Sequence, residues 1–135
     1  GVVLFLRCYK YAAAWMLDHP NGDANDELRA DLCAYASIFE GYPYVYGASG
    51  PNSFDCSGFV SYCLTGRYCR LGTTGTFMGW TRVSDPQPGD VVVNSYHTGI
   101  YIGGGQMIHA SDYNTGVIIS SVAAGMNNNY IFVRY

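Results

Sequence analysis

The residue types change along this 135-residue chain, and the change limits the folds available to it. Up to about position 65, apolar residues recur at three- and four-residue steps or in helix-like runs. After Gly89 they fall in short runs of β-branched and aromatic residues, separated by turn clusters such as Gly103-Gly104-Gly105 and Asn127-Asn128-Asn129. Short runs divided in this way at hairpin spacing are typical of antiparallel strands. Helices first and strands later predict an α+β fold.

Three helices are expected before the strands. The first covers roughly Leu4 to Leu17, the second opens at Asp26 and closes at Gly41, and the third runs from Ser57 to about Thr65 with Asp55 as a plausible cap. Five strands in an antiparallel meander are expected at 91–93, 98–102, 106–110, 117–122 and 130–133.

Composition favours one domain over residues 1–135, with a single core and a monomer as the favoured state. About half of the residues, 49%, are hydrophobic, so the chain is large enough to fold without metal or disulfide crosslinks. Only 13% are charged and the net charge is −3, so no basic stripe is present to neutralise phosphates. We therefore expect no nucleic-acid partner and no binding to an anionic membrane surface.

The apolar stretch from Val2 to Leu17 does not predict a membrane span. Arg7 and Lys10 interrupt it, and it is too short for a spanning helix. The same internal charges argue against a signal peptide. Any export signal is expected to have been removed or left out.

Five cysteines make an odd count, which leaves at least one thiol without an intramolecular disulfide partner. If Cys56 is a nucleophile, the remaining four allow three pairings that the sequence does not choose between. The favoured interpretation is that these four are buried small apolar side chains, namely Cys8, Cys33, Cys63 and Cys69.

Cys56, His97 and His109 form the arrangement expected of a thiol nucleophile, a base and an orienting group. Cys56 opens a helix, and the two histidines lie on strands joined by a turn near Gly104. In that antiparallel hairpin they are cross-strand neighbours within one register step. The helix end and an imidazolium both favour the thiolate, whereas Asp55 opposes it unless backbone amides or substrate bind its carboxylate.

Zinc binding is the rival use of these side chains, since one cysteine with two histidines is an accepted ligand set. No Cys-x-x-Cys, His-x-x-x-His or His-Glu-x-x-His pair is present to position two ligands locally. Phosphate-loop and dinucleotide motifs are also missing, because Gly103-Gly104-Gly105 precedes a strand-like run. We expect no metal and no cofactor, and His19 in its turn is left unassigned.

Several segments together resemble the NlpC-type cell-wall peptidases, a family of papain-like cysteine peptidases. The match runs in order from about Leu28 to Tyr135, and residues 1–25 form an unmatched N-terminal helical extension. The segments that carry it are Gly41-Tyr42-Pro43-Tyr44-Val45-Tyr46-Gly47, Phe54-Asp55-Cys56-Ser57-Gly58-Phe59-Val60, Pro88-Gly89-Asp90-Val91-Val92, His97-Thr98-Gly99-Ile100-Tyr101-Ile102-Gly103 and Met107-Ile108-His109-Ala110.

The resemblance implies a papain-like α+β fold, with the nucleophile helix packed on a C-terminal antiparallel sheet. It also implies hydrolysis of the bond between γ-D-glutamyl and a diamino acid in peptidoglycan stem peptides, by a protein secreted to the cell wall or periplasm. The implied roles are nucleophile for Cys56, base for His97, orienting residue for His109, oxyanion contact for Tyr44, and substrate binding for Asp55 and Ser57.

Two alternatives stay open: an amidase or acyltransferase on the same scaffold, and a non-catalytic cell-wall binding module. The chain has Gly47-Ala48 where family members commonly carry two glycines, and Val92 and Val93 where they carry bulky aromatics, which affects the expected pocket shape. Aromatic residues that either line a groove or belong to the core are Tyr42, Tyr44, Tyr46 and Trp80. Candidate cations for substrate carboxylates are Arg67, Arg70 and Arg82.

Overall fold

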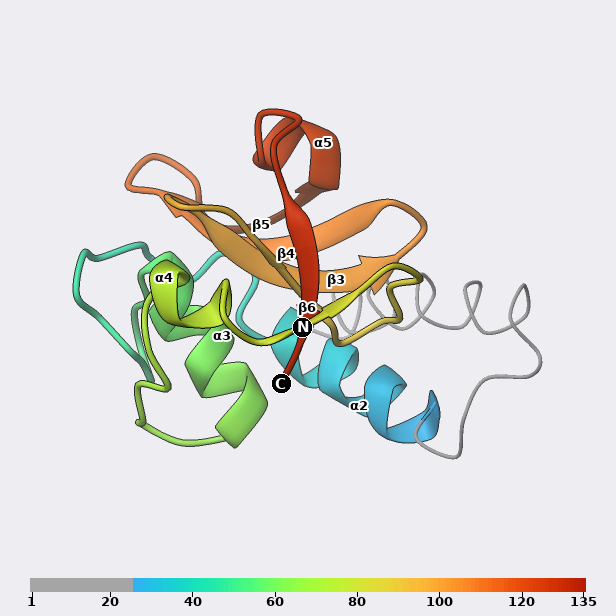
Figure 1. Ribbon diagram of the computed structural model, residues 1–135. Helices are drawn as coiled ribbons and strands as arrows, with labels where there is room; N and C mark the ends of the chain where they lie inside the picture. The colour runs from blue at the N-terminus through green and yellow to red at the C-terminus, as the bar shows by residue number, and fades with distance from the viewer. Residues whose placement is uncertain (1–25) are drawn as a thin grey trace.

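The structure is a computed structural model that describes residues 26–135. The helix expected at 4–17 lies outside these residues. Within them, α2 (Asp26–Ser37) is followed by α3 (Cys56–Thr65), a short α4 (Thr74–Phe77) and a short α5 (Val122–Gly125). Helices come mainly before the strands, so the predicted α+β class is confirmed (Figure 1).

Helix α3 begins and ends where its capping residues dictate. The Asp55 side chain accepts a hydrogen bond from the Gly58 backbone N–H, and Gly66 closes the helix in the left-handed region at φ 70°. The predicted start and end of this helix are therefore confirmed. Helix α2 ends earlier than expected, at Ser37, and a turn then leads to Gly41 at φ 91°.

A six-stranded sheet forms the second half of the molecule, with every neighbouring pair antiparallel. Its order is β1-β6-β2-β3-β4-β5, and its strands are β1 (Thr81–Val83), β2 (Val91–Val93), β3 (Thr98–Gly103), β4 (Gln106–Asp112), β5 (Gly116–Ser121) and β6 (Ile131–Arg134).

The predicted meander is correct only for β2 to β5. The last strand, β6, returns to the other edge of β2 and lies between β2 and β1, a strand that was not expected. The strand expected to continue through Val122 ends at Ser121, because the Ser121 hydroxyl accepts from the Ala124 N–H and caps α5.

Helices cover both faces of the sheet (Figure 1). Helices α2 and α3 pack on one face, where Phe39, Phe59 and Val60 join sheet residues such as Ile100 and Ile108 in the main core. Helix α5 lies on the opposite face over a smaller cluster that includes Met107, Val122 and Met126. Burial of each large apolar side chain stabilises the fold by about 1.5–3 kcal/mol.

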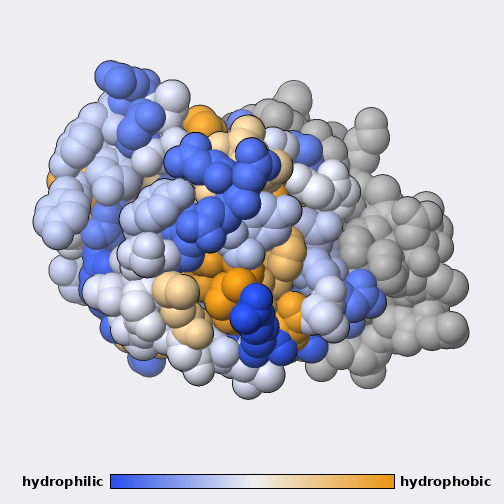
Figure 2. Space-filling model, turned by 45° about the horizontal axis from the view of Figure 1, so that its top comes forward, coloured by the Kyte–Doolittle hydropathy of each residue, from blue (hydrophilic) through white to orange (hydrophobic). Residues whose placement is uncertain are grey.

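Polar side chains cover most of the face that carries α5, and apolar residues reach its surface in a small central area (Figure 2). Within residues 26–135, no helix has both the length and the apolar character needed to cross a bilayer.

Candidate active site

Cys56 is the first residue of α3 and is partly exposed, whereas its neighbours Asp55 and Ser57 are buried. The helix packs its apolar residues, including Phe59 and Val60, against the sheet. The predicted nucleophile therefore has a fixed backbone position at a helix N-terminus. A helix N-terminus carries partial positive charge from its unpaired N–H groups.

The carboxylate of Asp55 is fully engaged beside the cysteine. One oxygen accepts from the Gly58 N–H at 2.7 Å and from Arg70 Nη2 at 3.0 Å, and the other accepts from the Gly47 N–H at 2.9 Å. Backbone amides and a guanidinium therefore bind the Asp55 carboxylate. These donors reduce the electrostatic repulsion between Asp55 and a thiolate at Cys56.

A close approach between α3 and the preceding loop requires glycine at position 58. A Cβ added there would lie 2.1 Å from the carbonyl oxygen of Ala48. The same carbonyl accepts the Asp55 N–H at 2.8 Å and Arg70 Nη2 at 3.3 Å. The loop at Gly47-Ala48 is thus held against the start of the helix by backbone contacts.

The two histidines of the hairpin are in direct contact, as the sequence predicted. His97 Nε2 lies 2.7 Å from His109 Nδ1. The strand register pairs Ile100 with Ile108 and Tyr101 with Met107. Continued by one residue, the same register places Gly99 opposite His109. A Cβ at Gly99 would lie 2.8 Å from the His109 Cβ, so glycine leaves the space that the diagonal contact needs.

A turn before β3 holds His97, and sequence reasoning did not predict this turn. The side-chain oxygen of buried Asn94 accepts from the backbone N–H groups of Tyr96 at 2.9 Å and His97 at 2.8 Å. The Asn94 amide also donates to the carbonyl of Asn129 at 2.8 Å. The position of His97 is therefore tied to the segment that leads into β6.

The start of β3 approaches Cys56 at the beginning of α3. The backbone N–H of Thr98, the residue after His97, forms a hydrogen bond with the Cys56 thiol and lowers its pKa. The Thr98 hydroxyl donates to the Val92 carbonyl at 2.7 Å and anchors this strand end to β2. Neighbouring elements thus bring together residues far apart in the sequence.

Burial is the main influence on the protonation of Cys56, His97 and His109. It raises the pKa of Cys56 above 9.0, and the Asp55 charge raises that pKa further. Burial also lowers the pKa of His97 below 6.5, while burial and the neighbouring His97 lower the pKa of His109 to about 3. These directions favour a neutral thiol and a neutral imidazole in the substrate-free protein, because burial and the Asp55 charge outweigh the N–H donors to the sulfur.

Arg70 is expected to moderate the effect of Asp55 on the thiol. In Arg70→Gln the carboxylate loses its cationic partner, so the thiol pKa should rise by about half a unit or more. The pH dependence of iodoacetamide alkylation at Cys56, followed by mass spectrometry, measures this shift. Arg67→Gln is the matched control, because Arg67 is exposed and is not among the residues around Cys56. Equal midpoints in the two variants would contradict this role.

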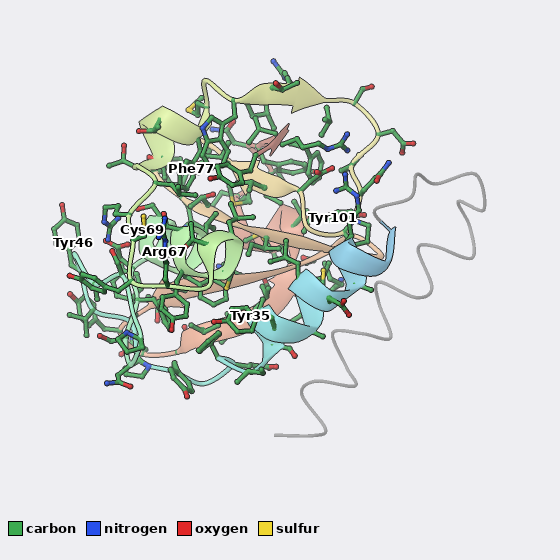
Figure 3. The ribbon with its side chains drawn as sticks, turned by 90° about the horizontal axis from the view of Figure 1, so that it is seen from below. Tyr35, Tyr46, Arg67, Cys69, Phe77 and Tyr101 are labelled. Atoms are coloured by element: carbon green, nitrogen blue, oxygen red, sulfur yellow. The ribbon has the colours of Figure 1, made fainter. Side chains whose placement is uncertain are left out.

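A cleft of about 430 Å³ opens over Cys56. Tyr44 forms part of its wall, with its ring 4.9 Å from that of Tyr113 in an edge-to-face contact. Tyr46 is 82% exposed and projects from the rim of the molecule (Figure 3). The cleft is lined by Tyr44, Tyr46, Gly47, Asp55, Cys56, Ser57, Arg70, Thr73, Thr74, Ser95 and Tyr96.

The predicted site residues thus divide into two adjoining groups. Tyr44, Asp55, Cys56 and Ser57 line the cleft, and His97 follows directly on its wall residues Ser95 and Tyr96. His109 lies behind His97 and is 1% exposed. Sequence reasoning did not find the wall residues Thr73 and Thr74, which lie at the start of α4, a helix that it also missed.

Of the other candidates, only some reach the cleft. Among the three arginines considered, Arg70 lines it, whereas Arg82 lines a separate hollow beside β1 and β6. Tyr42 packs on Phe39, and Trp80 packs on Phe77, so both belong to the core rather than to the cleft wall. Across residues 26–135 no three His, Cys, Asp or Glu side chains converge as metal ligands.

A cysteine at the N-terminus of a helix that packs on an antiparallel sheet, with a histidine pair on that sheet, defines a papain-like α+β fold. The profile of the NlpC/P60 family matches residues 41–134. The chain belongs to the NlpC/P60 family.

Individual relatives are similar over the same region. The probable endopeptidase p60 of Listeria grayi is 45% identical over 100 residues, which cover 67% of this chain and 19% of that protein. A probable endopeptidase of Mycobacterium tuberculosis is 33% identical over 105 residues, covering 73% of this chain and 27% of the relative. The chain thus spans about a fifth to a quarter of the length of these relatives.

Solved structures of the family have the same fold. The NlpC/p60 domain of the peptidoglycan hydrolase SagA is 33% identical, with a TM-score of 0.64, and the match covers 77% of this chain and 97% of that one. An NlpC/P60 family protein of Bacillus cereus is 26% identical, with a TM-score of 0.66, and the match covers 79% of this chain and 39% of that one.

Proposed function

We propose that this chain is the catalytic domain of a cysteine endopeptidase that hydrolyses peptidoglycan stem peptides. The observation that carries the proposal is the position of Cys56, at a helix N-terminus in an open cleft whose wall continues into the His97–His109 pair. Membership of a family that includes proteins named p60 endopeptidase and peptidoglycan hydrolase supports the substrate class. Action outside the cell, at the cell wall or in the periplasm, follows from that substrate.

In the first half of the reaction, the Cys56 sulfur attacks the amide carbonyl carbon as its proton passes to His97. The Cys56 backbone N–H and the Tyr44 hydroxyl stabilise the negative charge that develops on the carbonyl oxygen. His97 then donates the proton to the departing amine as the C–N bond breaks. The product of this half is a thioester between Cys56 and the acyl part of the substrate.

In the second half, water attacks the thioester while His97 accepts one of its protons. The C–S bond breaks, the carboxylic acid leaves, and His97 returns the proton to the sulfur. His109 orients the His97 ring through the 2.7 Å contact. The thiol and the imidazole end the cycle as they began.

The bond proposed for cleavage joins γ-D-glutamyl to a diamino acid, either diaminopimelate or lysine. Such a peptide carries free carboxylates, and Arg70 is the candidate arginine that lines the cleft. Asp55 and Ser57 remain proposed substrate contacts because both line the same cleft. Their present partners are protein groups, since Arg70 Nη1 donates to the Ser57 hydroxyl at 2.7 Å.

Digestion of purified muropeptides, followed by mass spectrometry, tests the proposal. Cleavage at the γ-D-glutamyl bond adds one water and leaves two fragments with a new carboxylate and a new amine. Transfer of the acyl group to another amine would identify an acyltransferase, and release from the sugar would identify an amidase. Intact muropeptides after incubation with the folded protein would indicate a binding module.

The pKa directions predict a broad pH optimum for kcat/KM. At low pH kcat/KM falls when His97 gains a proton, and burial lowers the pKa of His97 below 6.5. At high pH kcat/KM falls when Cys56 loses its proton, and the pKa of Cys56 is raised above 9.0. Activity should therefore be nearly constant between these values. A pH series of initial rates on a muropeptide measures this. Rapid alkylation of Cys56 at acidic pH would instead indicate a stable thiolate–imidazolium pair.

A further inference from the structure

The hydrogen-bond chain from His97 does not end at His109. His109 Nε2 lies 2.8 Å from the hydroxyl oxygen of Ser120, and that hydroxyl donates to the carbonyl oxygen of Ser121 at 3.1 Å. Ser120 lies on β5 opposite Met107, and His109 lies opposite Ile118, so the contact crosses diagonally between β4 and β5.

The direction of every bond in this chain follows from where the single Ser120 proton points. The Ser121 carbonyl oxygen can only accept; with the Ser120 proton on that bond, the Ser120 oxygen accepts a proton from His109 Nε2. Burial keeps His109 neutral, with its pKa lowered to about 3, so its Nδ1 carries no proton. That nitrogen accepts from His97 Nε2–H at 2.7 Å. A neutral His97 then has a free lone pair on Nδ1.

The opposite direction would disable the base. If the serine donated to His109 Nε2, His109 Nδ1 would carry the proton and donate to His97 Nε2. His97 would then hold its own proton on Nδ1 and would have no free nitrogen facing the thiol. A second, independent feature limits the space around this bond: a Cβ added at Gly125 of α5 would lie 2.9 Å from the Ser120 oxygen and 3.2 Å from His109 Nε2.

We infer that Ser120 is a positioning residue that sets the tautomers of His109 and His97. It acts through the two imidazoles and does not contact the substrate. The effect of Ser120 on catalysis rests on the proposed peptidase function. The effect of Ser120 on the histidine tautomers is independent of that function. Glycine at position 125 leaves room for the hydroxyl between α5 and the sheet.

Long-range ¹H–¹⁵N spectra of the histidine rings test the inference without any substrate. In the unaltered protein both His97 and His109 should carry their proton on Nε2. In Ser120→Ala a substantial population of each ring should move its proton to Nδ1, and Ser120→Thr, which keeps a hydroxyl, should restore the original pattern. A proton on Nδ1 of His109 in the unaltered protein, or identical spectra for Ser120→Ala, would overturn the inference.

The kinetic consequence is a loss of kcat/KM in Ser120→Ala of about ten- to a hundredfold, the loss expected when one buried donor loses its acceptor. The loss should fall on kcat with KM unchanged, because no substrate contact is removed. Ser84→Ala removes an exposed hydroxyl that lies outside this chain of hydrogen bonds and should retain activity. Normal kcat in Ser120→Ala would refute the role of Ser120. If the unaltered protein shows the Nε2–H tautomers but cleaves no muropeptide, only the proposed function is refuted.

Discussion

Cys56→Ala is expected to lower kcat on a muropeptide by at least about 10⁴-fold, the scale of loss seen when a nucleophile that acts as a unit with its base is removed. Alanine has no nucleophilic atom, so the thioester cannot form. The helix start should remain intact, because the Asp55 cap bonds to the Gly58 N–H and not to the cysteine side chain. Initial rates from mass spectrometry of the digest, with circular dichroism to verify folding, measure the effect.

Cys69→Ala is the matched control for the thiol. Cys69 is also partly exposed, yet it is not among the residues that line the cleft. Its replacement should leave the rate unchanged. A Cys56→Ala protein that still cleaves, or a Cys69→Ala protein that does not, would show that another thiol carries the reaction.

Asp90→Asn is expected to destabilise the fold by about 3–5 kcal/mol, the usual cost of removing one partner of a buried ion pair. Asp90 is 1% exposed. Its two oxygens accept from Arg134 Nε at 2.8 Å and Nη2 at 2.9 Å, and Arg29 Nη1 lies 3.3 Å from one of them. The group joins the turn before β2 to β6 and α2. Urea unfolding followed by fluorescence measures the change.

Asp31→Asn provides the comparison for this substitution. Asp31 is exposed on α2, and exposed substitutions away from such networks usually change stability by less than about 0.5 kcal/mol. A similar small change in Asp90→Asn would mean that the two guanidinium groups need no carboxylate between them. The interpretation of Asp90 as a structural residue of the Pro-Gly-Asp segment would then be wrong.

The parts of the fold that were predicted correctly depend on neighbours in the sequence. Helix α3 was expected because Asp55 precedes an apolar run that reaches about Thr65, and the β3–β4 hairpin because Gly103-Gly104-Gly105 separates two strand-like runs. The contact between His97 and His109 followed from that hairpin, since its register is determined by the turn. Caps, turns and strand alternation involve residues only a few positions apart.

The parts that were missed depend on contacts between distant segments. Strand β6 lies between β1 and β2, and nothing in residues 131–134 specifies those partners. Helices α4 and α5 are each 4 residues long, too short for a periodic pattern to reveal.

The residue types from Asp55 to Thr65 and from His97 to His109 therefore determine the helix that begins at Cys56, the hairpin and the residues on which the proposed chemistry depends. Only the tertiary structure decides the protonation of Cys56, the ion pairs of Asp90 and the partner of His109, because desolvation and long-range hydrogen bonds depend on what surrounds a group in space. The sequence leaves open whether the helix end or Asp55 prevails at Cys56, and the folded site raises the thiol pKa, first through burial and then through the Asp55 charge.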